Sequence, residues 1–212
     1  MHKRFVVAYR LFFGGLTLLA LLVQLSTGLQ RESFSVLNFF SFFTIESNIL
    51  AALIFLITGF AALKVKSLPW IEVLRGAATV YMITTGLVYA FLLAGLEESL
   101  QTPIPWVNAV LHYIMPLAVL VDWFMALPAR RMQFRRALVW LLFPLAYVAY
   151  SLIRGSYTGW YPYPFLNPDQ GGYGAVIVTG LIIAVGITAI VWLIAWTTRL
   201  KVIVNKPAKR TT

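Results

Sequence analysis

The side chains of this sequence best suited to chemistry are a threonine and a histidine, each inside a long apolar stretch. Thr44 lies in one stretch, and His112, the only histidine apart from His2, lies in another. A threonine hydroxyl is a weak nucleophile that needs a neighbouring base. Histidine is the usual base, because its pKa lies near neutral pH. Such a pair inside a lipid-facing bundle would suit hydrolysis of an acyl ester that partitions into the bilayer.

Helical spacing adds polar groups beside both residues. Thr44, Ser47 and Asn48 stand at i, i+3 and i+4 and share one helix face, as do Asn108 and His112. Ser47, Asn48 and Asn108 are therefore candidates to orient the imidazole or to stabilise an oxyanion. The competing interpretation is that these groups only join helices by hydrogen bonds. Candidates for the lining of a substrate cavity are Tyr81, Thr84, Thr85, Tyr89, Tyr161 and Tyr163.

The sequence offers few residues that could bind a metal ion or a haem. The chain has no cysteine and two histidines, one of them at position 2. A haem held by two histidines inside the membrane and a polyhistidine metal site both need more than His112 alone. We expect no metal site and no cofactor.

The elements that must position these residues are membrane-spanning helices. Hydrophobic residues make up 60% of the 212 residues and charged residues 11%, whereas soluble domains are about 25% charged. A helix needs about 20 apolar residues to cross the hydrocarbon core. We predict an all-α bundle of six transmembrane helices in one domain, residues 1–212, with spans at about 5–28, 34–63, 76–95, 104–127, 137–153 and 173–198.

The basic residues predict the orientation. All of the 17 Lys and Arg residues except Arg31 and Arg154 lie at the ends of spans or in loops that share one side. Because basic loops stay in the cytoplasm, both termini are predicted to be cytoplasmic. This scattering in short clusters is typical of topology signals and argues against nucleic acid as the partner of a chain with net charge +10.

This topology sets Thr44 and His112 at similar depth. Counting along each predicted span puts His112 about 12 Å and Thr44 about 15 Å below the outer edge. The outer loop 154–172, with three prolines, four glycines and many aromatic residues, cannot form a long helix. It either folds back over the bundle mouth as a lid or anchors the chain at the interface. Near the inner edge, Arg10 and Asp122 are predicted to pair.

Two of these segments carry a family resemblance. Phe-Phe-Thr44-Ile-Glu-Ser-Asn48 and Asn108-Ala-Val-Leu-His112-Tyr-Ile-Met-Pro116 resemble motifs of the androgen-induced and androgen-dependent six-helix membrane proteins. Asp122-Trp123 and the segment Tyr161-Pro-Tyr-Pro-Phe-Leu-Asn-Pro resemble a bacterial branch of that superfamily. The resemblance implies a hydrolase of fatty acid esters of hydroxy fatty acids, with Thr44 as nucleophile and His112 as its partner. The aromatic outer loop departs from the animal members.

The expected partner is thus a membrane lipid or lipid-like ester, and the expected location is the cell membrane, by resemblance the bacterial inner membrane. Two other functions stay open: a lipid or small-molecule binding or transport protein, and a structural assembly subunit. The sequence shows neither the inverted repeats nor the paired broken helices typical of transporters.

Overall fold

The fold is all-α. A computed structural model describes residues 2–64, 69–97, 103–128 and 130–204. Within them, six helical segments are long and apolar enough to cross a membrane, which confirms the predicted multi-pass bundle. These segments are Lys3–Gly28, Phe43–Ala61, Trp70–Leu93, Pro105–Met125, Phe134–Thr158 and Gly172–Leu200.

Several of the spans are built from more than one element. The order is α1 (His2–Gly28), α2 (Val36–Phe40), α3 (Phe43–Lys64), α4 (Pro69–Val88), the π-helical turn η1 (Tyr89–Leu93), α5 (Pro105–Ala109), the π-helical turn η2 (Val110–Ile114), α6 (Met115–Met125), α7 (Phe134–Ala137), the 3₁₀ turn η3 (Leu138–Leu141), α8 (Leu142–Thr158), the 3₁₀ turns η4 (Pro164–Leu166) and η5 (Pro168–Gln170), and α9 (Gly172–Val204).

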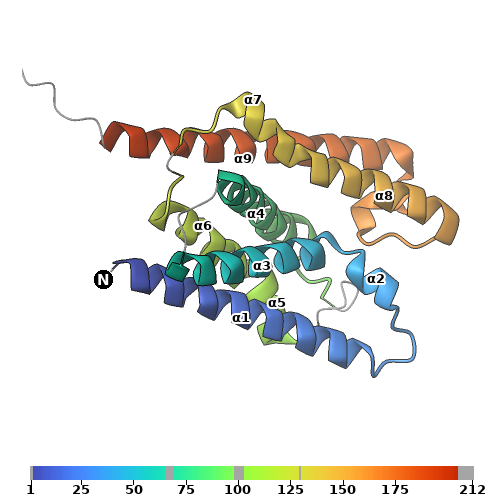
Figure 1. Ribbon diagram of the computed structural model, residues 1–212. Coiled ribbons are helices and arrows are strands. Elements are labelled where there is room, and N and C mark those ends of the chain that lie inside the picture. The colour runs from blue at the N-terminus through green and yellow to red at the C-terminus, as the bar shows by residue number, and fades with distance from the viewer. Residues whose placement is uncertain (1, 65–68, 98–102, 129, 205–212) are drawn as a thin grey trace, which may run out of the picture.

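The helices run roughly side by side, with α4 in the middle. Figure 1 shows α1 along one side of the bundle and α8 with α9 along the other. α3 packs between α1 and α4, and α4 also contacts α6 and α9. The start of α1 and the far end of α9 lie at the same end of the bundle (Figure 1). That placement fits an even number of spans, while the side of the membrane that this end faces stays a prediction.

The predicted second span, 34–63, is wrong at its outer end. The chain forms the short helix α2, turns at Ser41 and Phe42, and begins the spanning helix α3 at Phe43. Tyr147 of α8 donates a hydrogen bond to the Ser41 carbonyl (3.0 Å), and the Ser41 hydroxyl bonds to that of Tyr150 (2.8 Å). Tyr147 thus satisfies a backbone carbonyl that a continuous helix would have satisfied itself. Thr44 consequently lies in the first turn of α3 rather than in mid-helix.

The outer loop is shorter than predicted. Residues 154–158 belong to α8, which ends where Gly159 takes φ +67°. Within this last part of α8, the missing side chain of Gly155 leaves room for the ring of Tyr161, which lies where a Cβ would stand. The non-helical connection therefore runs from 159 to 171, with η4 and η5 inside it.

Gly76 offers a test of the packing between α4 and η3. A Cβ at this position would collide with the ring of Trp140, which is 1% exposed. The ring cannot retreat easily, because its Nε1 donates to the Val73 carbonyl at 3.0 Å. We expect Gly76→Ala to destabilise the protein by about 1–3 kcal/mol, measured by thermal unfolding in detergent.

Gly180 of α9 is the matched control for this substitution. It is also helical, but no atom lies within 4 Å of the place that a Cβ would take. Gly180→Ala should leave stability unchanged or raise it by about 0.5–1 kcal/mol, because alanine favours helix. Equal melting temperatures for the two variants would contradict the packing described here.

Candidate functional site

Thr44 lies in the first turn of α3, under the outer connection. It is 7% exposed. Its backbone N–H, which has no partner within the helix, donates to the hydroxyl of Tyr163 at 3.2 Å. Its Oγ1 lies 3.4 Å from the same phenol oxygen. N–H groups at a helix start favour negative charge nearby. This position therefore suits a nucleophile whose attack turns a carbonyl oxygen into an oxyanion.

The outer connection between α8 and α9 supplies Tyr163. Tyr163 is 5% exposed and packs edge-on against Phe42. Burial raises the pKa of its phenol, so the group keeps its proton at neutral pH. Trp160 packs against Phe42 as well, and Phe165 stacks on Tyr163. Between the two predicted roles of this segment, these contacts favour the lid over the interfacial anchor.

Asn48 and Ser47 lie one helical turn farther along α3, and both face neighbouring helices. The Asn48 Nδ2 donates to the carbonyl of Thr44 at 2.8 Å and to that of Leu111 at 3.1 Å. Its Oδ1 is buried and has no hydrogen-bond partner in the described part of the chain. Ser47 bonds through its hydroxyl to that of Thr85 at 3.0 Å. These bonds join α3 to α4 and to η2 at one level.

His112 lies inside the π-helical turn η2 and is 2% exposed. Its Nδ1 is 3.2 Å from the Asn108 carbonyl. Because a carbonyl oxygen only accepts, this bond requires a hydrogen on Nδ1, and in the neutral ring Nε2 then keeps its lone pair. Gly86 lets α4 approach closely here, since a Cβ would stand 3.3 Å from the His112 carbonyl. The imidazole is thus held in the tautomer that a general base needs.

Tyr89 covers the ring of His112. The two rings are stacked, with centroids 3.9 Å apart and planes 20° apart. Tyr89 is the first residue of the other π-helical turn, η1. The Asn108 Nδ2 donates to the Tyr89 hydroxyl at 2.6 Å, and that hydroxyl donates to Glu97 at 2.6 Å. π-Helical turns are rare and frequently lie at functional sites, and here two of them face each other.

The structure connects the segments that carry Thr44 and His112 without a direct bond between the two side chains. Among the residues that the structure describes, no hydrogen bond joins the two side chains. Asn48 links their segments instead, through the carbonyls of Thr44 and Leu111, the residue before His112. The predicted pairing of nucleophile and base therefore stays a prediction.

The predicted cavity candidates differ in what they contact. The Tyr81 hydroxyl donates to the Trp140 carbonyl at 2.9 Å, which gives this residue a packing role. Thr84 bonds back to the Val80 carbonyl of its own helix. Tyr161 lies against Gly155 on the outer side. Only Thr85, Tyr89 and Tyr163 contact the polar groups around Thr44 and His112.

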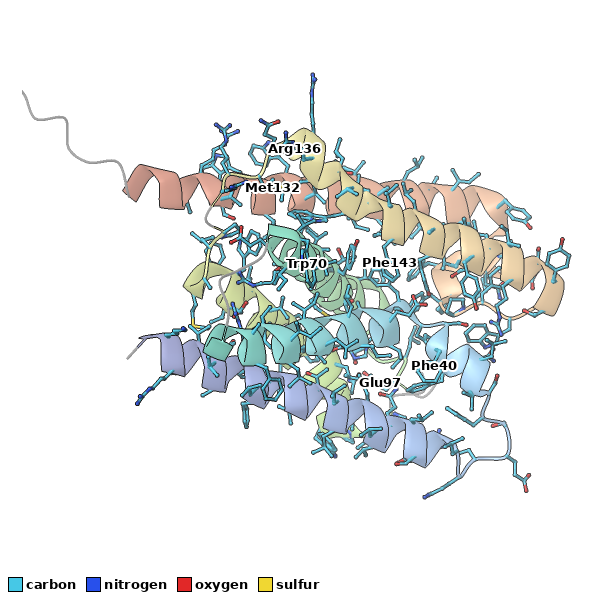
Figure 2. The ribbon with its side chains drawn as sticks, in the orientation of Figure 1. Phe40, Trp70, Glu97, Met132, Arg136 and Phe143 are labelled. Atoms are coloured by element: carbon cyan, nitrogen blue, oxygen red, sulfur yellow. The ribbon has the colours of Figure 1, made fainter. Side chains whose placement is uncertain are left out.

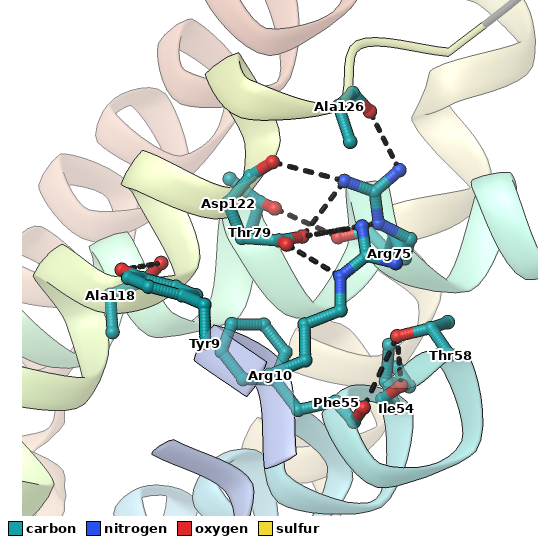
Figure 3. Close-up of polar contacts among 10 residues, drawn as sticks. All are labelled: Tyr9, Arg10, Ile54, Phe55, Thr58, Arg75, Thr79, Ala118, Asp122 and Ala126. Atoms are coloured by element: carbon teal, nitrogen blue, oxygen red, sulfur yellow. Dashed lines mark hydrogen bonds and ion pairs between the residues drawn. The ribbon is translucent and has the colours of Figure 1, made fainter. Parts of the chain in front are cut away.

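Figure 3 shows a second buried polar cluster, built around Asp122. The predicted pair of Arg10 and Asp122 is present, with Nε to Oδ1 at 2.6 Å. Arg75 is a second arginine on the same carboxylate, with Nη2 to Oδ2 at 2.8 Å, and its Nη1 reaches the Ala126 carbonyl at 2.8 Å. This cluster ties α1, α4 and α6 together.

Sequence reasoning misses two of these residues. The charge of Arg75 predicts a place in an inner loop, but the residue lies inside α4. Glu97 does not stand out, because it lies in a polar connection outside the spans. The sequence signal for Glu97 is its place a few residues after a helix end that contains aromatic residues.

Among the described residues, no group of three or more His, Cys, Asp or Glu side chains could hold a metal ion. Comparison with known proteins finds no matching family, no matching curated protein and no matching solved structure.

Proposed function

We propose that this protein is an intramembrane hydrolase of lipid esters, such as fatty acid esters of hydroxy fatty acids, with Thr44 as nucleophile and His112 as base. We further propose that it works in the cell membrane with both termini in the cytoplasm. The observation that carries the proposal is the convergence on Thr44 of a helix start, a backbone N–H without a partner in the helix, and a phenol. The resemblance of the two motifs around Thr44 and His112 supports the same reaction.

The reaction runs in two halves. The Thr44 Oγ1 attacks the ester carbonyl carbon, and its proton passes to the Nε2 of His112. The carbonyl oxygen becomes an oxyanion, which the Thr44 N–H at the start of α3 would stabilise. When the ester C–O bond breaks, His112 returns the proton to the leaving alcohol. Water then attacks acyl-Thr44 in the same way, releasing the fatty acid and restoring the threonine.

Proton transfer requires that Nε2 reach Thr44 directly or through one water once the ester is bound. Catalytic hydrogen bonds are often long in ligand-free enzymes and tighten in the complex. The Tyr163 hydroxyl occupies the position beside the Thr44 N–H that an ester oxygen would take. The bound ester therefore displaces or shares this phenol, which makes the outer connection part of substrate entry.

A fluorophosphonate probe tests the nucleophile. Attack by Oγ1 forms a P–O bond, breaks the P–F bond and releases fluoride, while the proton goes to His112. We expect mass spectrometry of the labelled protein to locate the probe on Thr44 and Thr44→Ala to abolish labelling. Thr58 is the matched control, because it is a buried threonine of the same helix, bonded to the Ile54 carbonyl.

Thr58→Ala should therefore label like the parent protein. Labelling of Thr44→Ala at the parental rate, or attachment of the probe to another residue, would rule out Thr44 as nucleophile. A protein that retains lipid through purification yet neither labels nor turns over would support the binding or transport function instead.

A further inference from the structure

Tyr89 is held at three points around His112. Its ring stacks on the imidazole, and its hydroxyl is fixed on one side by the Nδ2 of Asn108 and on the other by Glu97. Asn108 also supplies the backbone carbonyl that bonds to the His112 Nδ1. The imidazole is therefore held by its edge through Asn108 and by its face through Tyr89. The Tyr89 hydroxyl connects these two residues, because it accepts from the Asn108 side chain.

Glu97 lies outside the membrane-spanning segments, beyond the end of η1. Figure 2 shows it at the end of the bundle where Phe40 lies, away from Met132 and Arg136. Its Oε1 accepts from the Tyr89 hydroxyl at 2.6 Å and from the Gly95 N–H at 3.0 Å. Gly95 presents that N–H by adopting φ +89°, a conformation that glycine adopts without steric cost.

The charge state of Glu97 fits an acceptor. The hydrogen bond from Tyr89, followed by bonds from the backbone N–H groups of Glu97 and Gly95, lowers the pKa of the carboxyl below its ordinary value of 4.5. Glu97 is therefore a carboxylate at neutral pH. A hydrogen bond to a charged acceptor is shorter and stronger than one between neutral groups.

We propose that Glu97 is a positioning residue for His112: it anchors the Tyr89 hydroxyl and, through Tyr89 and Asn108, fixes the imidazole in its Nδ1–H tautomer. The catalytic meaning of this role rests on the proposed function, but the positioning itself does not. The two π-helical turns belong to the same arrangement, because Tyr89 lies in one and His112 in the other, with their rings stacked.

The full chain with His2→Gln tests this proposal, because His112 is then the only histidine. In that protein, ¹⁵N-labelled at histidine and held in detergent micelles, the imidazole nitrogens should report the Nδ1–H tautomer. The ring protons should be shifted upfield by the stacked phenol. We expect Glu97→Ala to move the nitrogen shifts toward a mixture of tautomers and to reduce the upfield shift.

Tyr89→Phe keeps the ring but removes the hydroxyl, and we expect it to change the nitrogen shifts in the same direction. Glu32→Ala, at an exposed carboxylate of another connection, is the matched control and should leave the spectrum unchanged. Parental nitrogen and proton shifts in both Glu97→Ala and Tyr89→Phe would overturn the positioning role.

An ester hydrolysis assay separates this proposal from the proposed function. If both hold, Glu97→Ala lowers kcat by about 10- to 100-fold and leaves KM nearly unchanged, because a misplaced base slows the chemistry without weakening binding. If Thr44 is not labelled and no ester is cleaved, the proposed function fails, whereas the histidine spectrum still decides the role of Glu97.

Discussion

Asp122→Ala is expected to be the most destabilising single substitution in the bundle. Asp122 accepts from Arg10 and Arg75, and all three side chains are buried. Removing the carboxylate leaves two guanidinium groups facing each other without their counterion, and arginine does not lose its proton in proteins. Breaking a buried ion pair in this way costs about 3–5 kcal/mol. Thermal unfolding in detergent should show a fall in Tm on the order of 10 °C.

Two controls give this result its meaning. Asp169→Ala removes an exposed carboxylate from η5 and should leave Tm unchanged. The triple variant Arg10→Met, Asp122→Leu and Arg75→Met removes the whole cluster and should recover most of the lost stability, because apolar side chains of similar volume need no desolvation. A triple variant as unstable as Asp122→Ala would mean that the cluster is not held by charge compensation.

The six spans could be predicted because each depends on a property visible along the chain. A run of apolar residues long enough to cross the hydrocarbon core can be recognised in the sequence without knowing which helices pack beside it. The bond between Arg10 and Asp122 was predictable for a related reason. Two opposite charges near the same membrane edge, inside otherwise apolar helices, have few other ways to be satisfied. The structure confirms that bond and adds Arg75 to it.

The break before α3 could not be predicted, because its cause lies elsewhere in the chain. Residues 34–63 contain no proline, and their single glycine, Gly59, lies far from the break. The helix ends near Ser41 because tyrosines of α8 bond to that residue. The two π-helical turns could not be predicted from the sequence either. One extra residue per turn leaves an apolar pattern intact, while rotating Tyr89 and His112 toward each other.

The sequence predicts the residue types of the candidate site, and the structure shows some of the contacts among them. Ser47 bonds to Thr85, and Asn48 bonds to the carbonyl of Leu111. The count of depth for Thr44 no longer holds, because α3 begins at Phe43 and not at residue 34. Tyr163 and Thr44 are 119 positions apart in the sequence, and no local pattern predicts a contact between them. Glu97 is recognisable only once the Tyr89 hydroxyl has a position in space.

Thr44→Ala and His112→Ala should have the largest effects on activity. If the two side chains act as one unit, each single variant lowers the rate of hydrolysis of a long-chain ester by about 10³-fold or more. The double variant should be no slower than the slower single variant, because the second substitution removes a partner that is already idle. The measurement is kcat/KM for the parent and the three variants in the same detergent.

Independent roles give the opposite result. If His112 only stabilised the bundle, His112→Ala would lower kcat/KM by the same factor in the parent protein and in Thr44→Ala. The losses of the two single variants would then multiply in the double variant. His112→Ala would then lower Tm as well, since the imidazole fills the space beside Tyr89. An Asn48→Leu variant sharpens the distinction. It has no donor for the carbonyls of Thr44 and Leu111, so it loosens the link between the two segments while leaving nucleophile and base in place. In a coupled pair, this change slows hydrolysis in the parent protein and has no further effect in the double variant.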